Sequence, residues 1–230
     1  MLRKGDDYYN EHHYRGYCYS GTAIGQEREV SGWVNTGTTI TFNPAFSPAL
    51  TTGDKLELHH IFTEDEYRRA INAAIASLKD GKYIIDMSDE ATIALSANTY
   101  EYSLPSTMSF VHRIITEETA GGGVFNEADV IDPRDWRLIS SRKLKLNDDR
   151  YSIVAGKDLR VEGQGAQAEV TSDTATIALP LEWLIQKAIT FLPKSKIQSN
   201  KLDDTYRQAL ALSANEPRRW PNPIARRVLE

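Results

Sequence analysis

The chain has 230 residues, enough for one large domain or two small ones with a proper hydrophobic core. With 40% hydrophobic residues, 26% charged residues and a net charge of -5, the composition is that of a globular protein and excludes a general basic nucleic-acid-binding protein. The single cysteine, Cys18, cannot form an internal disulfide. No apolar run approaches the roughly 20 residues that span a bilayer, and residues 1–10 lack the apolar centre of a signal sequence. We therefore expect a soluble protein made in the cytoplasm.

Residues 1–62 are expected to form a small β barrel or sandwich. Their short runs of alternating or β-branched side chains are typical of half-buried strands. Turn residues at Gly21 and at 35–37, and a loop rich in proline and glycine, separate these runs. Four strands are predicted, at 14–19, 26–34, 38–42 and 55–60.

A change to helical spacing begins the second predicted domain, residues 63–214. Apolar side chains from Tyr67 to Leu78 recur at intervals of three and four residues, which places them on one helix face. Thr63 is a suitable N-cap and Glu66, three residues later, completes a capping box. Gly81 stands where such a helix would end.

Strand patterns dominate residues 84–179, which predict an antiparallel sheet. The octet at 88–95 returns almost unchanged at 172–179, and we interpret it as one turn-plus-strand used twice. Glycines at 121–123 mark a mobile loop inside this region. The predicted strands are 91–95, 99–104, 110–116, 136–140, 143–146, 151–154 and 158–161.

Two further amphipathic helices bring the expected number to about three, so the predicted fold class is α+β. One follows Pro180 with an apolar stripe from Leu181 to Leu192, and the other extends from Leu202 to Leu210. Residues 215–230 contain three prolines and four arginines and have too few apolar residues to form a core. They are predicted to be an extended C-terminal arm that orders on a partner.

Catalytic motifs are absent from the sequence. The glycines at 21–25 and 163–165 lack the lysine of a phosphate-binding loop, and there is no Gly-x-Ser-x-Gly elbow. The adjacent acidic pairs at 117–118, 148–149 and 203–204 have diverging side chains and are expected to be solvated surface. We predict no catalytic residue and no cofactor.

Histidines are the remaining candidates for metal binding. Neighbouring residues of a strand point to opposite faces, so neither His12–His13 nor His59–His60 can chelate a metal alone. One histidine of each pair could bind zinc together with Glu57. We prefer the interpretation that these are polar strand ends, and no metal site is predicted.

Several stretches in a fixed order resemble the head-to-tail adaptor proteins of tailed phages. They are FTEDEYRRAINAAI from Phe62, ANTYEYSLPSTM from Ala97, DWRLISSRKLKL around Trp136, DLRVEGQG from Asp158 and ALPLEWLIQKAITFL from Ala178. The resemblance implies a non-catalytic virion protein, assembled in the host cytoplasm. In this family identical subunits, often twelve, form a ring that links the portal protein to a tail or nozzle protein.

The resemblance also implies that the C-terminal arm reaches into the portal. Prolines keep such an arm extended, arginines can pair with acidic rims, and apolar side chains can act as anchors. A mildly acidic chain suits a ring lumen through which DNA passes without specific binding, since neutralising phosphates is what creates affinity. The expected docking residues are Pro217, Arg218, Arg219, Trp220, Ile224, Arg226, Arg227, Val228 and Leu229.

Three other functions remain open at the level of sequence. One is a different non-catalytic virion part, such as a tail terminator or baseplate subunit. Another is a carbohydrate- or receptor-binding module, with Tyr14, Tyr17 and Tyr19 as a sugar-stacking face. The last is an enzyme that uses the histidines.

Overall fold

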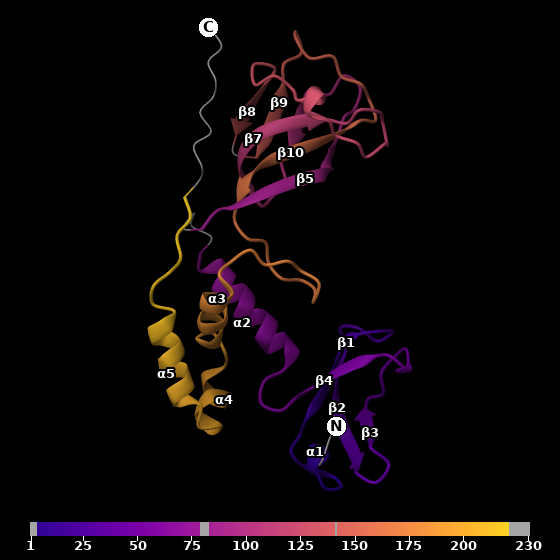
Figure 1. Cartoon of the computed structure of the whole chain (residues 1–230), viewed down its shortest axis with the longest axis vertical. Coiled ribbons are helices and arrows are strands. Elements are labelled where there is room, and N and C mark those ends of the chain that lie inside the picture. The colour runs from indigo at the N-terminus through magenta and orange to yellow at the C-terminus, as the bar shows by residue number, and fades with distance from the viewer. Residues whose placement is uncertain (1–3, 79–82, 141, 221–230) are drawn as a thin grey trace. The chain divides into compact units, whose positions relative to one another are not determined.

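The computed structural model describes residues 4–78, 83–140 and 142–220 (Figure 1). They form an α+β fold in which every pairing between named strands is antiparallel, which confirms the predicted fold class at this level. The chain divides into two compact units, residues 1–77 with 169–216 and residues 78–168 with 217–230. Each unit is therefore built from two separate stretches, whereas the sequence suggested three consecutive domains, 1–62, 63–214 and 215–230.

The first unit begins with a four-stranded sheet close to the predicted one. Strands β1 (Arg15–Ser20), β2 (Glu27–Val34), β3 (Thr39–Asn43) and β4 (Lys55–His59) lie in the order β3-β2-β1-β4. Trp33 and Val30 of β2 pack against Tyr9 of the short helix α1 (Tyr8–Glu11). Burial of these large apolar side chains stabilises this small sheet.

Of the expected barrel or sandwich, the closed barrel is not formed. β3 and β4 are the two edges of the sheet, and closure would need hydrogen bonds between them. The connection between these strands instead carries Phe46, which is buried with Cys18 and Ala23 in a second small core. A loop and α1 thus cover apolar side chains that a barrel would enclose.

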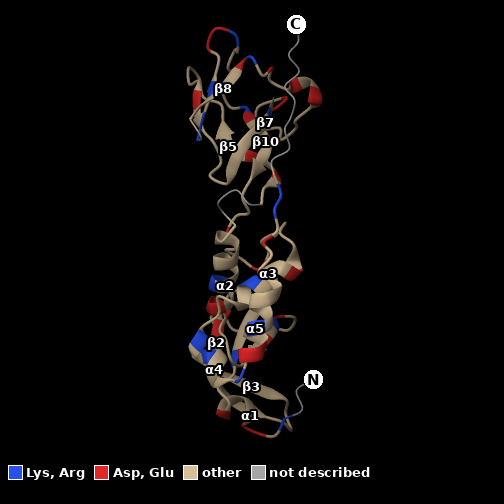
Figure 2. Ribbon diagram, turned by 90° about the vertical axis from the view of Figure 1, so that its left-hand side faces the viewer, with Lys and Arg blue, Asp and Glu red and all other residues tan. Residues whose placement is uncertain are grey.

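Helices complete the first unit. Helix α2 (Glu64–Ala76) has the predicted capping box: the Thr63 side chain accepts from the Glu66 N–H at 3.2 Å, and the Glu66 carboxylate accepts from the Thr63 N–H at 2.9 Å. Acidic residues fill its first turn, where the helix dipole favours them, and arginines follow (Figure 2). The predicted stop at Gly81 lies outside the described residues.

The second stretch of this unit folds as α3 (Leu181–Ile189), α4 (Lys194–Ser199) and α5 (Asp203–Leu212). α3 packs against both α2 and α5. Trp183 is buried, and its indole N–H donates to the Ser213 carbonyl at 3.3 Å. The three predicted helices are present, and the described residues add the short helices α1 and α4 to them. α3 ends at Ile189, before Pro193, and Pro193 is the N-cap residue of α4.

The second unit contains two three-stranded sheets. One has β5 (Ile85–Ala94), β10 (Asp158–Gly165) and β7 (Met108–Thr116) in the order β5-β10-β7. The other has β6 (Glu101–Ser103), β9 (Lys143–Leu146) and β8 (Trp136–Ser140) in the order β6-β9-β8, and a short 3-10 turn, η1 (Glu127–Asp129), lies between β7 and β8. One hydrophobic core joins the sheets: Ile93, Ile114, Leu159 and Val161 from the first with Trp136, Leu144 and Leu146 from the second.

Glycines in β10 allow close contact with its neighbour β7. A Cβ atom at Gly163 would lie 1.9 Å from the Phe110 carbonyl oxygen, and one at Gly165 would lie 2.0 Å from the Thr107 carbonyl oxygen. The strand pairing is irregular at these positions. Any side chain here would push the strands apart.

Two strand predictions between residues 84 and 179 are wrong. Residues 151–154 form no strand, although Tyr151 and Ile153 pack on the core, because local turns use backbone groups such as the Tyr151 N–H, which donates to the Asn147 carbonyl. The second copy of the octet, residues 172–179, also lies outside the named strands. No helix among the described residues is long and apolar enough to cross a membrane.

Candidate functional site

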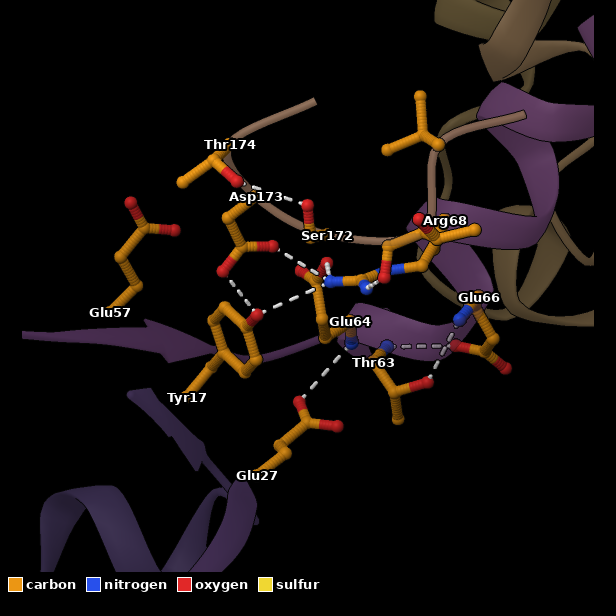
Figure 3. A network of polar contacts seen from close by, with 12 residues as sticks. Tyr17, Glu27, Glu57, Thr63, Glu64, Glu66, Arg68, Ser172, Asp173 and Thr174 are labelled. Carbon is orange, nitrogen blue, oxygen red and sulfur yellow. Dashed lines mark hydrogen bonds and ion pairs between the residues drawn. The ribbon is translucent and has the colours of Figure 1, made fainter. Parts of the chain in front are cut away.

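A polar cluster around Arg68 joins three distant stretches of the first unit (Figure 3). The Arg68 guanidinium lies 2.7 Å from the Asp173 carboxylate, 3.0 Å from the Glu64 carboxylate and 2.8 Å from the Thr171 carbonyl oxygen. The Tyr17 hydroxyl, on β1, accepts from Arg68 at 3.2 Å and donates to Asp173. We call Tyr17, Glu64, Arg68, Thr171 and Asp173 the Arg68 cluster.

The surroundings of Tyr17 keep its phenol protonated. Burial and the hydrogen bond that the phenol donates to Asp173 raise the pKa of Tyr17 to about 12. A neutral donor between a guanidinium and a carboxylate completes the hydrogen bonding of a partly exposed ion pair. The Arg68 cluster therefore acts as a structural junction between β1, α2 and the 171–173 segment.

His59 extends the junction toward the sheet. Its Nδ1 atom lies 3.1 Å from the Glu27 carboxylate, and its ring stacks on Tyr17 with centroids 5.8 Å apart. Glu27 also accepts from the Glu64 N–H at 3.3 Å, so β2, β4 and α2 meet at one carboxylate. The side chain of His59 is only 10% exposed, which limits its access to a substrate.

The structure brings the two histidine pairs near each other but does not assemble a zinc site. His12 and His60 have ring centroids 6.5 Å apart, and His60 stacks on Tyr14. His59, the neighbour of His60 in the chain, has its Nδ1 atom beside Glu27, and its Nε2 atom lies 3.6 Å from Glu57. Over the stretches that the structure describes, no three His, Cys, Asp or Glu residues form a group that could hold a metal ion.

The three tyrosines proposed for sugar stacking differ widely in exposure. Tyr17 is buried and held by the Arg68 cluster, whereas Tyr19 is 37% exposed. Tyr14 is half-buried against Tyr9 and His60. Burial of the central ring disfavours the use of this trio as a stacking platform.

The arm residues fall into a described and an undescribed part. Pro217, Arg218, Arg219 and Trp220 belong to the described chain, and Trp220 is 69% exposed. Arg219 is tied to the second unit: its carbonyl accepts from the Ile84 N–H at 3.0 Å, and its guanidinium lies 2.6 Å from Asp86. The other predicted docking residues, Ile224, Arg226, Arg227, Val228 and Leu229, lie outside the described residues.

A cavity of about 700 Å³ lies in the second unit beside this attachment. Strands β5, β7 and β10 supply residues to it, among them Asp86, Arg113 and Glu162. Arg113 is held by Glu162 at 2.7 Å and by Glu127 at 2.6 Å. No local sequence pattern predicts this cavity, because its residues come from strands far apart in the chain. The rest of the lining is largely apolar and includes Met87, Val130, Ile131, Pro133 and Trp136.

Glu117 corrects the prediction that the acidic pairs are solvated surface. It is 1% exposed, and its carboxylate accepts from the backbone N–H groups of Gly121, Gly123 and Asp158. The N–H groups of Gly123 and Asp158 are the strongest influences that hold the pKa of Glu117 below its usual value. The carboxylate thus organises the glycine loop at 121–123. The sequence signal for this role is an acidic residue four positions before a run of glycines. Glycine has no side chain to cover its N–H group, so a nearby carboxylate can accept from it.

Comparisons with known proteins add no relative from which function could be transferred. The sequence matches no protein-family model and no curated protein.

Proposed function

We propose that this chain is a non-catalytic structural subunit of a tailed-phage particle, a head-to-tail adaptor. Its copies form a ring, of twelve subunits as the resembled family implies, between the portal protein and a tail or nozzle protein. The C-terminal arm docks on the portal, and DNA passes through the lumen without specific binding. A net charge of -5 is consistent with that passage.

The main observation that supports this proposal is the exposure of Trp220. At 69%, it is the most exposed large hydrophobic side chain among the described residues, and Arg218 and Arg219 precede it. Tryptophan and arginine are the side chains that most often dominate binding energy at protein interfaces. An indole left in solvent beside arginines therefore favours an arm with an external protein partner.

Exposed apolar side chains on two helices support the ring. Leu181 and Ile185, one turn apart on α3, are 65% and 49% exposed, and Leu212 on α5 is 56% exposed. A closed ring requires that one surface of a subunit contact a different surface of the next. Apolar side chains that the subunit leaves uncovered are suited to such a contact.

The decisive experiment measures binding of the full-length chain to the portal protein of the same phage. Replacing Trp220 by Ala should weaken binding by at least roughly tenfold, the loss typical of an interface anchor. Val154→Ala is the matched control, because Val154 is another exposed apolar residue (53%) that lies outside the arm. Equal affinity of wild type and Trp220→Ala would contradict docking through this anchor.

Sizing tests the ring itself. We expect the purified subunit to be monomeric and to form rings only on a portal template. Rings that assemble without the portal, or a complex with a single subunit, would contradict this order of assembly.

A further inference from the structure

The hairpin of β8 and β9 concentrates positive charge in an acidic chain. Residues 136–146 contain Arg137, Arg142, Lys143 and Lys145 and no acidic residue, whereas the whole chain has a net charge of -5. Both strands belong to the sheet β6-β9-β8 of the second unit. A local excess of one sign is a candidate recognition surface, because it creates a field that attracts a partner of the other sign.

Alternation along the strands places three of these cations on one face. The side chains of Leu144 and Leu146 in β9 are fully buried. Lys143 and Lys145 alternate with them and therefore lie on the solvent side, roughly 7 Å apart. Arg137 of β8 is the register partner of Lys145, and both side chains line the same hollow of about 370 Å³. We call Arg137, Lys143 and Lys145 the basic face.

The basic face lacks counter-ions of its own. Within residues 4–78, 83–140 and 142–220, none of its three cations forms an ion pair with a carboxylate. Glu101 of β6 is the register partner of Lys145 on its other side, yet no ion pair joins them. Arg137 and Lys145 stand directly opposite each other, where like charges repel. Other arginines of this unit do pair with carboxylates, namely Arg113, Arg134, Arg150 and Arg160.

Phosphates of a nucleic-acid backbone are the anions that suit such a face best. Duplex DNA carries one charge per roughly 1.7 Å of its axis and a condensed layer of counter-ions, which are released when cations of a protein neutralise its phosphates. The carboxylates of a folded protein have no such condensed layer to release. The Arg137 guanidinium can donate two hydrogen bonds to one phosphate, and lysines can contact phosphates as point charges.

We propose that the basic face binds the phosphate backbone of DNA, with one phosphate between Arg137 and Lys145 and another at Lys143. Contacts with phosphates carry no sequence information. Three such contacts give a weak attachment that salt readily breaks, so DNA can still move past the subunit without specific binding. The inference goes beyond the adaptor function and needs neither ring nor portal.

Two acidic residues limit the surface at one end. Asp148 and Asp149 follow β9 and line the same hollow as Arg137 and Lys145. Both aspartates are exposed, and their charge repels a phosphate that approaches from this end. Replacing Asp148 and Asp149 together by Asn should therefore strengthen DNA binding by roughly twofold or more.

Fluorescence anisotropy of the full-length chain with a labelled duplex of about 20 base pairs tests the proposal. Between about 20 and 200 mM salt, the logarithm of the affinity should fall with the logarithm of the salt concentration at a slope of about -2.7, for three phosphate contacts. Replacing all three residues of the basic face by Gln should weaken binding at least roughly tenfold at the lowest salt and bring the slope near zero. A duplex of different sequence should bind equally well.

The matched control removes the same charge from the first unit. Arg15→Gln with Lys55→Gln and Lys201→Gln changes one arginine and two lysines that are also exposed. This variant should keep the slope of the wild type. An equal loss of binding in the control would overturn the proposal, because net charge alone would then explain the affinity.

Three further results would also overturn it. One is an unchanged slope in the basic-face variant, and another is unchanged affinity after Asp148→Asn with Asp149→Asn, which remains measurable even if the triple variant does not fold. The last is binding of polyglutamate as tight as that of the duplex, because the partner would then be an acidic protein. No portal is involved, so each of these results is distinguishable from a failure of portal docking.

Discussion

Two nearly identical octets adopt different structures in the two units. Residues 88–95 and 172–179 differ only at Glu90 and Thr174. The first copy lies largely within β5, pairs with β10 and buries Ile93 and Leu95 in the core of the second unit. The second lies in no named strand, and its Ile177 is only half-buried.

The aspartates of the octets show why the copies diverge. Asp89 accepts locally from the Thr92 N–H at 2.9 Å and hydroxyl at 3.1 Å. Asp173 instead accepts from Arg68 and Tyr17, which lie 105 and 156 residues away in sequence. Strand preference depends mainly on the surface available to pack against. The first copy lies beside β10, and the second meets an arginine on a helix.

Replacing the equivalent isoleucines should give the largest difference. Ile93→Ala removes a fully buried side chain and should lower the free energy of unfolding of the second unit by about 2–5 kcal/mol. Ile177→Ala should cost the first unit less than about 1 kcal/mol, because its side chain is only half-buried. Hydrogen exchange of the core amides of each unit, measured during urea unfolding, gives the free energy of unfolding of both units. Equal losses would mean that both copies are packed alike.

Replacing the equivalent aspartates should give a smaller difference in stability. Here the first unit should lose more stability than the second. Asp173→Ala leaves Arg68 and Tyr17 without a common acceptor and should destabilise the first unit by about 1–2 kcal/mol, a value reduced for partial exposure. Asp89→Ala should cost about 0.5 kcal/mol, since it breaks only a local turn. A double-mutant cycle of Asp173→Ala with Tyr17→Phe should reveal coupling. Additive effects would contradict the Arg68 cluster as a unit.

Alkaline pH should weaken the Arg68 cluster, which binds Asp173 of the second octet. It should not affect the contacts of the first octet. Burial and the bond to Asp173 raise the pKa of folded Tyr17 from 10.0 to about 12. The folded protein keeps a proton that the unfolded chain releases, so this stabilisation is complete below pH 10 and is lost as pH rises toward 12. Other tyrosines titrate too, and the relevant quantity is the difference between wild type and Tyr17→Phe. A difference that does not change over this range would contradict the assignment.

Making the octets identical should have the smallest effect. Glu90→Thr gives the first copy the sequence of the second and removes an ion pair of 2.7 Å with Arg160, which should cost about 0.5 kcal/mol. Thr174→Glu gives the second copy the sequence of the first and should not create a strand. Backbone chemical shifts of both variants would test this. A conformational change in either octet would show that one residue, and not the surroundings, selects the structure.

Local patterns predicted the elements of this fold well. The capping box of Thr63 and Glu66 and the strands at 136–140 and 143–146 are present as expected, because short-range spacing determines them. The sequence could not show that the N-terminal sheet stays open, since that depends on where Phe46 packs. It also could not show that residues 169–216 return to the first unit.

Long-range polar contacts were the hardest to predict. No local signal connects Arg68 to Asp173 or places Asp86 beside Arg219, because each pair meets only after distant elements have packed. Trp220 could be singled out, since an aromatic residue among prolines and arginines has no local core to join. Its exposure in the structure agrees with that reasoning.

The buried thiol of Cys18 makes the outer surface suitable for site-directed labelling. Cys18, on β1, is the only cysteine of the sequence, and it is free and fully buried against Ala23 and Phe46. A maleimide probe should leave the folded wild type unmodified, since reaction requires an accessible thiolate. One cysteine introduced at an exposed position would then be the single site that carries gold or a fluorophore, so labelling at that cysteine would test whether the chain belongs to a phage particle, as proposed.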